Sequence, residues 1–340
     1  MTDIKISTLA PGDLAGIDQW TETVKASWTE DLPLFPAPSK PNLMISLMLP
    51  AEAVRTEYIT ASVDGRIVGV SEAVFHLKDN THLVEFELDV HPEFRRRGVA
   101  TAILDHIERR AVADGRRTLM IYAPDQLRED YPKHVAGQAL LEKHGYTKGL
   151  DEVRRTADLD LVPAAELDEQ LAGAWERAEG YELVQWINHA PEELVDGIAY
   201  LDGRLLQDAP MGTLDMEPQK VDAERVRQNE RRASSRGDLK VNTVVRHIES
   251  GTVAGWTDIM VQSGVEEHAW QGITIVDPDH RGHRIGTILK IENHRLVRAY
   301  RPHVKYVHTW NAEENDFMIS INEAVGYRAQ ERWLAYQKKI

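Results

Sequence analysis

The stretch HPEFRRRGVATAILDHIERRA, residues 91–111, decides the fold. It joins an extended run that ends at Val90 to a segment with apolar residues at four-residue spacing. That spacing is typical of an amphipathic helix. A strand that leads directly into a helix leaves backbone N–H groups unpaired at the helix start. Together with the helix dipole, these groups can bind an anion such as phosphate.

The residue types at this junction favour an anion site over an ordinary solvated turn. Gly98 and Ala100 lack bulky side chains, so a phosphate can approach the backbone closely. The three arginines, 95–97, offer planar guanidinium groups that match phosphate oxygens. A basic helix start that only contacts solvent is the alternative. Recurrence of the pattern elsewhere in the chain favours the anion site.

The chain contains a tandem duplication, which indicates two domains of the same kind. Several landmarks recur at one offset without an insertion between them. Further on, LLEKHGYTK matches INEAVGYRA at an offset shorter by five residues. The landmarks that recur 186 positions apart are Gly65 and Gly251, Gly69 and Gly255, His91-Pro92 and Asp277-Pro278, Arg95 and Arg281, and Ala100 and Gly286.

Each copy predicts the same order of elements. Strands are expected at 57–63, 66–77 and 81–90 and a helix at 95–113; the second copy repeats these at 240–249, 252–262, 268–276 and 281–299. A strand and a shorter helix follow in each copy. The alternation of sheet and helix indicates an α/β or α+β fold. We expect an N-terminal domain at 1–160 and a C-terminal domain at 161–340, with a connecting helix at 162–180.

Composition narrows the classes of function. The 340 residues contain 42% hydrophobic residues and no cysteine, which excludes disulfides, thiolate catalysis and Cys-ligated zinc. The net charge of -15 argues against nucleic acid as a partner. No apolar run is long enough for a membrane span, and the N-terminus lacks a signal-peptide pattern, so we expect a cytoplasmic protein. The fourteen histidines show no ligand spacing, so no metal is expected.

The motifs resemble those of the GNAT N-acetyltransferases. Arg95-x-x-Gly98-x-Ala100 is similar to the acyl-CoA pyrophosphate loop of that family, Gln/Arg-x-x-Gly-x-Gly/Ala. Arg281-x-x-Arg284-x-Gly286 is similar too, with an arginine at the middle glycine. NDFMISINEAVGY, from Asn315, resembles the family's later motif with an asparagine in place of its tyrosine. The ending resembles actinobacterial members, among them mycothiol synthase and secondary-metabolite acetyltransferases, including those of clavulanic-acid-type antibiotic clusters.

The resemblance implies two tandem GNAT domains, each a twisted mixed β-sheet flanked by helices, and acetyl-CoA as cofactor. It also implies which residues bind that cofactor, through backbone N–H groups at the strand end, through the loop and through polar groups beyond it. Asn311 has a second interpretation as a helix N-cap. The implied set is Leu88, Val90, Arg95, Arg96, Arg97, Gly98, Val99, Ala100, Thr101 and His134 in the first copy, and Ile275, Val276, Arg281, Gly282, His283, Arg284, Ile285, Gly286, Thr287, Asn311 and Asn315 in the second.

Carboxylates are the candidates for the base that acetyl transfer to an amine requires. Glu85, Glu87 and Asp89 share one face of the strand HLVEFELDV, where burial would raise their pKa values. Simple exposure to solvent is the alternative. Glu72 and Asp258 recur 186 positions apart in apolar rows, where an edge position or a salt bridge is the competing interpretation.

The general acid and the acceptor site are less defined. The family's usual tyrosine is absent from both copies, and Tyr122 or His134 could replace it. Tyr146 and Tyr327 are expected to pack in the core. Early loops are expected to line the acceptor site, with the candidates Trp28, Glu30, Asp31, Asp215 and Glu217.

The sequence therefore predicts an N-acetyltransferase that moves an acetyl group from acetyl-CoA to a primary amine of a small molecule by direct attack. The first copy keeps the better loop and is expected to bind CoA more tightly. A non-catalytic acyl-CoA-binding protein, or one active and one degenerate domain, is the alternative. Monomer and homodimer both remain open.

Overall fold

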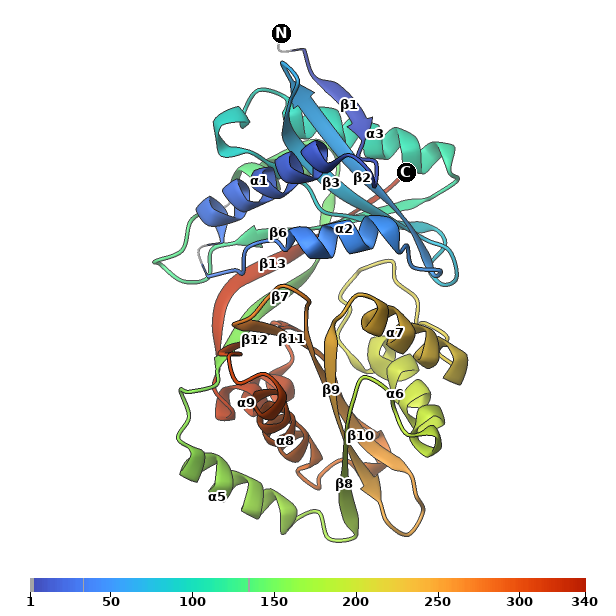
Figure 1. Cartoon of the computed structure of the whole chain (residues 1–340), viewed down its shortest axis with the longest axis vertical. Helices are drawn as coiled ribbons and strands as arrows, with labels where there is room; N and C mark the ends of the chain where they lie inside the picture. Colours follow the sequence, from blue (N-terminus) through green and yellow to red (C-terminus); the bar gives the residue numbers. More distant parts are fainter. Residues whose placement is uncertain (1–2, 33, 134) are drawn as a thin grey trace. The chain divides into compact units, whose positions relative to one another are not determined.

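The computed structural model describes residues 3–32, 34–133 and 135–340 (Figure 1). The chain forms two compact units. The N-terminal unit comprises Met1–Glu152, Met211–Glu217 and Glu331–Ile340, and the C-terminal unit comprises Val153–Pro210 and Pro218–Gln330. The strands β7 (Thr147–Asp158) and β13 (Tyr327–Lys339) each contribute residues to both units. The expected domain boundary at residue 160 stays a prediction about the two sequence copies.

The N-terminal unit is a mixed sheet with the strand order β1-β2-β3-β4-β6-β13-β7. Its helices are α1 (Leu14–Asp31), α2 (Lys40–Met48), α3 (Val99–Ala113) and α4 (Val135–Lys143). Its remaining strands are β1 (Lys5–Thr8), β2 (Val54–Val63), β3 (Arg66–His76), β4 (Leu83–Phe86), β5 (Asp89–Val90) and β6 (Thr118–Asp125).

Strand alternation separates two hydrophobic layers in this unit. On one face, the helices α1 and α2 pack against Tyr58, Ile67 and Val70. On the other face, α3 and α4 pack against residues that include Phe75 and Phe86. The acidic face of residues 85–89 therefore points to the α1 side, as its alternation with Phe86 and Val90 predicts.

The C-terminal unit repeats this plan with the strand order β7-β12-β11-β10-β9-β8. The helices α6 and α7 cover one face of its sheet, and α5 and α8 cover the other. Its elements are α5 (Ala164–Trp175), β8 (Tyr181–Ile187), α6 (Val195–Asp208), α7 (Ala223–Ser235), β9 (Leu239–His247), β10 (Val253–Val261), β11 (His268–Val276), α8 (Ile285–Tyr300), β12 (Tyr306–Ala312) and α9 (Asp316–Ala324).

The mixed α/β architecture and the tandem plan confirm the predicted fold class. The long helices begin four residues later than predicted, because a short 3-10 turn and a loop with positive φ angles precede each of them. Helix α2 begins after Ser39, which caps it by accepting a hydrogen bond from the Asn42 N–H. The sequence interpretation also missed β8, α6 and α7.

One glycine in each unit lets the first turn of a helix lie directly on the sheet. A Cβ atom on Gly69 would lie 2.5 Å from Val99 Cγ1 and 2.9 Å from Ile103 Cδ1. A Cβ atom on Gly255 would lie 2.8 Å from Ile285 Cγ2. These distances are shorter than van der Waals contact, so any side chain here displaces the helix. The two glycines thus fix where α3 and α8 begin.

Among the described residues, no helix is both long and apolar enough to cross a membrane.

Replacing Gly69 by alanine is expected to lower the free energy of unfolding by about 1–3 kcal/mol, because the added methyl group overpacks the contact with Val99. The matched control is Gly137→Ala in α4, where a Cβ atom meets no neighbour within 4 Å. This control is expected to gain up to about 1 kcal/mol from helix propensity. Urea unfolding followed by tryptophan fluorescence measures both. Equal stability of Gly69→Ala and the unmodified protein would contradict the packing argument.

Candidate active site

The site begins where two parallel strands of the N-terminal unit part. The strands β4 and β6 pair at Leu83–Thr118, Val84–Leu119 and Glu85–Met120, and the pairing ends there. Beyond it, residues 87–90 stay beside β3 in an unchanged register. The C-terminal unit repeats this arrangement, with three pairs between β11 and β12 that end at Trp270–His308.

Two backbone N–H groups of the N-terminal unit face the resulting opening. The Glu87 N–H donates to the Glu72 carbonyl at 3.0 Å, and the His91 N–H donates to Val68 at 2.9 Å. Because antiparallel pairing alternates, the N–H groups of Leu88 and Val90 point away from β3, toward the opening. Leu88 has no hydrogen-bond partner for its N–H within the described part of the chain. This places both predicted donors at the opening.

In the C-terminal unit the same alternation selects different residues. The Asp277 N–H donates to Ala254 at 2.9 Å, so the N–H groups of Thr274 and Val276 face the opening. The N–H of Ile275 faces β10 instead, and its side chain packs in the core with α6. The N–H of Val276 therefore faces the opening, and the second N–H that does so is that of Thr274 rather than that of Ile275.

The loops before α3 and α8 share one backbone conformation. Arg96 and Gly98 have φ angles of 62° and 87°, and their counterparts Gly282 and Arg284 have 90° and 57°. Each loop thus has two left-handed positions, one occupied by glycine and the other by arginine. Such a conformation costs a non-glycine residue about 1–3 kcal/mol, and it persists here in both copies. The arginine at 284 therefore keeps the loop geometry that the sequence motif predicts.

The first loop leaves more N–H groups available than the second. Among the described residues, the N–H groups of Gly98, Val99, Ala100 and Thr101 have no hydrogen-bond acceptor. In the second loop, the Thr287 N–H donates to the Arg284 carbonyl at 3.1 Å. Among the described residues, this leaves the N–H groups of Arg284, Ile285 and Gly286 without an acceptor. Both helix starts fit an anionic group, and the first offers the larger set of donors.

The arginine and histidine side chains of the loops differ in role. Arg95 donates to Asp31 at 2.7 Å, to Glu30 at 3.0 Å and to the Val90 carbonyl at 3.2 Å, so it ties the loop to α1. Arg281 pairs similarly with Asp208 on α6 at 3.0 Å. His283 lies 3.0 Å from the Arg177 carbonyl. Arg96 and Arg97 are exposed, with Arg97 over the Phe94 ring at 5.1 Å.

Carboxylates gather beside the opening of the N-terminal unit. Glu87 lies opposite Glu72 on β3, and Glu85 lies two residues earlier on the same face. The Glu87 side chain is exposed at the surface of the unit, although many protein atoms lie around its carboxylate. Burial, followed by the charges of Glu72 and Glu85, raises the pKa of Glu87 to about 7. Glu85 itself contacts His76 at 2.9 Å. The predicted acid row is therefore a real cluster.

Two further groups of this cluster have strongly perturbed pKa values. Burial raises the pKa of Asp89 to about 7, although hydrogen bonds from Ser27 and Trp28 of α1 oppose the shift. Burial, together with the charges of Glu152 and Glu85, raises the pKa of Tyr122 above its ordinary value. The Tyr122 phenol therefore holds its proton at neutral pH, and its raised pKa makes it a weaker acid than an exposed tyrosine. Tyr122 lies near enough to Glu85 for the charge of that carboxylate to act on it.

The counterpart face of the C-terminal unit is closed by internal partners. Asp258 accepts a hydrogen bond from the Ile273 N–H at 3.0 Å and lies 3.2 Å from Lys240. Gln271 matches Glu85 by the sequence offset, but its amide contacts Thr257 at 2.9 Å and the buried Lys290 of α8 at 3.2 Å, on the other face of the sheet. Asp258 is therefore held as a structural group rather than presented to a substrate.

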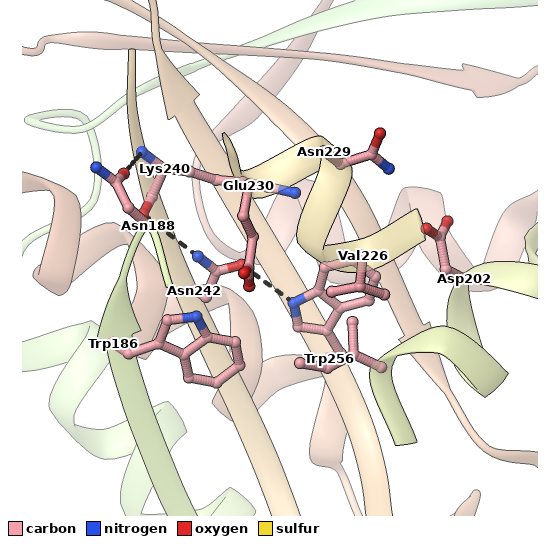
Figure 2. Close-up of a pocket in the computed structure, with 10 residues that line it drawn as sticks. Trp186, Asn188, Asp202, Val226, Asn229, Glu230, Lys240, Asn242 and Trp256 are labelled. Carbon is pink, nitrogen blue, oxygen red and sulfur yellow. Dashed lines mark hydrogen bonds between the residues drawn. The ribbon is translucent and has the colours of Figure 1, made fainter. Parts of the chain in front are cut away.

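A small hollow on this side of the C-terminal unit has about 350 Å³ of empty space, part of it open to solvent (Figure 2). Trp186 and Trp256 lie at its base, and Asn242 accepts a hydrogen bond from the Trp256 indole at 3.3 Å. The Glu230 carboxylate accepts from the Ala190 N–H at 2.8 Å and from Arg227 at 2.7 Å. Several polar groups of the hollow are thus paired within the unit.

The structure places the other candidates as follows. Asn315, not Asn311, caps α9 by accepting from the Met318 N–H at 3.2 Å, and Asn311 accepts from Asn322 at 2.7 Å. The N-cap interpretation of Asn311 was therefore wrong. His134 lies outside the described residues. Tyr146 and Tyr327 are buried in the two cores, as predicted.

The acceptor-site candidates hold structural contacts. Glu30 and Asp31 pair with Arg95, and Trp28 packs edge-on against Phe35 at 4.9 Å. Asp215 accepts from Thr118 at 2.7 Å, and the Glu217 N–H donates to Asn80 at 2.7 Å. Sequence reasoning missed Glu152 on β7, whose pKa burial raises to about 7. The available signal was its position two residues after Leu150, on the same face of the strand.

Comparison with known proteins agrees with this geometry. Residues 20–146 match the model of the Acetyltransferase (GNAT) family. The fold is similar to that of a tandem GNAT protein from the clavulanic acid biosynthesis pathway, with 25% identity, a TM-score of 0.81 and coverage of 99% of this chain and 98% of that one.

Residues 20–146 thus match a GNAT acetyltransferase domain, and the whole chain has the fold of a tandem GNAT protein.

Two further structures share this fold at lower identity. A GCN5-related N-acetyltransferase from Sphaerobacter thermophilus has 16% identity and a TM-score of 0.68, and the match covers 99% of this chain and 95% of that one. A putative acetyltransferase from Pyrococcus horikoshii has 14% identity and a TM-score of 0.57, and the match covers 99% of this chain and 89% of that one. The shared fold therefore extends over 99% of this chain.

The raised pKa values predict how stability changes with pH. A carboxyl whose pKa is higher in the folded state stabilises that state through its protonated form. The contribution of Glu87 to the free energy of unfolding is therefore fully present below pH 4.5 and is lost as the pH rises through about 7. Glu87→Gln removes this loss. We expect the variant to gain more in melting temperature over the unmodified protein at pH 8 than at pH 4.5. An equal difference at both pH values would contradict the raised pKa.

Proposed function

We propose that the N-terminal unit transfers an acetyl group from acetyl-CoA to a primary amine of a small molecule. The observation that carries this proposal is the coincidence of the opened strand pair, two N–H donors and a carboxylate cluster in one unit. The GNAT family match over residues 20–146 supports acyl transfer in general.

Each part of the site has a chemical role in this proposal. Acetyl-CoA supplies a thioester whose acyl carbon is open to nucleophilic attack. The N–H groups of Gly98 to Thr101, with Arg96 and Arg97, would hold its pyrophosphate. The N–H groups of Leu88 and Val90 face the place where the thioester carbonyl would bind, and they would polarise it.

The side chains on the acid face handle the protons. Glu87, with its pKa near 7, accepts the proton of the incoming ammonium group and leaves a neutral amine to attack directly. Tyr122 donates a proton to the departing thiolate. Direct attack requires no nucleophilic side chain, in keeping with a sequence without cysteine.

Glu87→Gln is expected to lower kcat by about 100-fold or more, because an amide cannot accept the proton. Tyr122→Phe is expected to lower kcat by about 10- to 100-fold. Release of free CoA thiol from acetyl-CoA in the presence of a panel of alkylamines measures both. The control is Glu52→Gln at an exposed position, with an unchanged rate expected. Undiminished activity of Glu87→Gln would contradict its role, and no turnover of any amine would contradict the proposed function.

For the C-terminal unit we propose acyl-CoA binding without catalysis. Its loop keeps the left-handed backbone of the first, which supports binding of a pyrophosphate. Its counterparts of the acids are Gln271, Ile273 and the internally paired Asp258, which leaves no carboxylate to serve as base. One active and one degenerate domain is the arrangement that these residues favour.

Thr101 and Thr287 offer a matched test, since they lie in the first turns of α3 and α8, 186 positions apart. A glutamate at either position suits the helix dipole but repels a bound pyrophosphate. Native mass spectrometry with acetyl-CoA is expected to show two molecules bound to the unmodified protein and one to each single variant. Activity is expected to be lost only in Thr101→Glu. Loss of activity only in Thr287→Glu would assign catalysis to the other unit.

A further inference from the structure

Glu152 is a carboxylate of the N-terminal unit that the proposed reaction does not use. It lies on β7 next to Asp151, whose side chain pairs with Lys148 at 2.9 Å. Among the described residues, Glu152 has no ion-pair or hydrogen-bond partner for its carboxylate, although its side chain is only partly exposed. A carboxylate removed from water without a partner is unfavourable, so a site of this kind is suited to a cation.

Strand alternation places Glu152 on the same face of the sheet as Tyr122. Leu150, two residues before Glu152, packs in one hydrophobic cluster with Met120, Tyr122 and Leu214. Residues 150 and 152 share a face because side chains alternate along a strand. Leu214 belongs to the segment Met211–Glu217, which covers part of this face within the N-terminal unit. Glu152 and the acid face of β4 therefore border the same side of the sheet.

The strand order sets the separation of Glu152 from the proposed base. Between Glu87, which follows β4, and Glu152 on β7 lie β6 and β13. Three strand spacings correspond to roughly 14 Å across the sheet, and the parting of β4 and β6 beyond Glu85 adds to this separation. Tyr122 lies between the two carboxylates, near enough to both Glu85 and Glu152 for their charges to act on it. The two carboxylates are thus placed to bind opposite ends of one extended molecule.

We propose that the acceptor is an amine with a second cationic group and that Glu152 binds this second group. This inference rests on the proposed function, because it takes the end of the acceptor near Glu87 as the reacting amine. The class of acceptor is then an extended diamine or polyamine. The excess of acidic residues in the chain, with a net charge of -15, favours the approach of such cations.

The test compares hexane-1,6-diamine with hexylamine, which has the same carbon chain and one cation fewer. With the unmodified protein, kcat/KM is expected to be at least about tenfold higher for the diamine, which one charge-assisted hydrogen bond can supply. In Glu152→Gln the ratio of the two kcat/KM values is expected to fall to near one, mainly through a higher KM for the diamine. Asp151→Asn, on the opposite face of β7, is the matched control and keeps the ratio.

The outcomes separate this inference from the proposed function. Turnover of both amines with equal kcat/KM, or a ratio that Glu152→Gln leaves unchanged, overturns the role of Glu152 while acetyl transfer stands. If neither amine is turned over, the proposed function fails, and calorimetric binding of hexane-1,6-diamine decides the inference by itself. Binding that weakens about tenfold in Glu152→Gln but not in Asp151→Asn supports it; equal binding to both variants, or none to the unmodified protein, overturns it.

Discussion

The contact between a sheet glycine and the first turn of a helix is the constraint on which each unit depends. Gly69 and Gly255 allow α3 and α8 to begin directly on the sheet, at distances that no side chain permits. The helix start then stands at the end of the strand pair that opens, so the N–H groups of the helix and of the strand converge on one place. A helix displaced by a methyl group would separate these two sets of donors.

The two units use this frame differently. In the N-terminal unit the acid face carries Glu72, Glu85 and Glu87, and burial, followed by the charges of the other two carboxylates, raises the pKa of Glu87 to about 7. In the C-terminal unit the same positions hold Gln271 and an Asp258 whose partners lie within the unit. Gln271 contacts the buried Lys290 of α8 on the other face of the sheet, and burial lowers the pKa of Lys290 to about 7. The duplicated frame therefore persists in the C-terminal unit, although Glu85 and Glu87 have no acidic counterparts there.

Much of this could be predicted from the sequence, because the decisive features are local. The offset of 186 residues, the glycines and the loop motif all lie within continuous segments, and residues 85–89 show their alternation directly. Contacts between distant segments could not be predicted. Two examples are the ion pair of Arg95 with Asp31 and the packing of Leu214 on the sheet. Each joins segments that are far apart in the sequence and meet only in the folded chain.

The central claim is that a carboxylate at the opening of the N-terminal unit accepts the proton in the reaction. The pH dependence of kcat/KM, measured with an alkylamine whose own ionisation lies well above the range, tests it most directly. We expect the rate of the unmodified protein to rise through an apparent pKa near 7, and this step to be absent from the residual activity of Glu87→Gln. The same step in both proteins would contradict the claim.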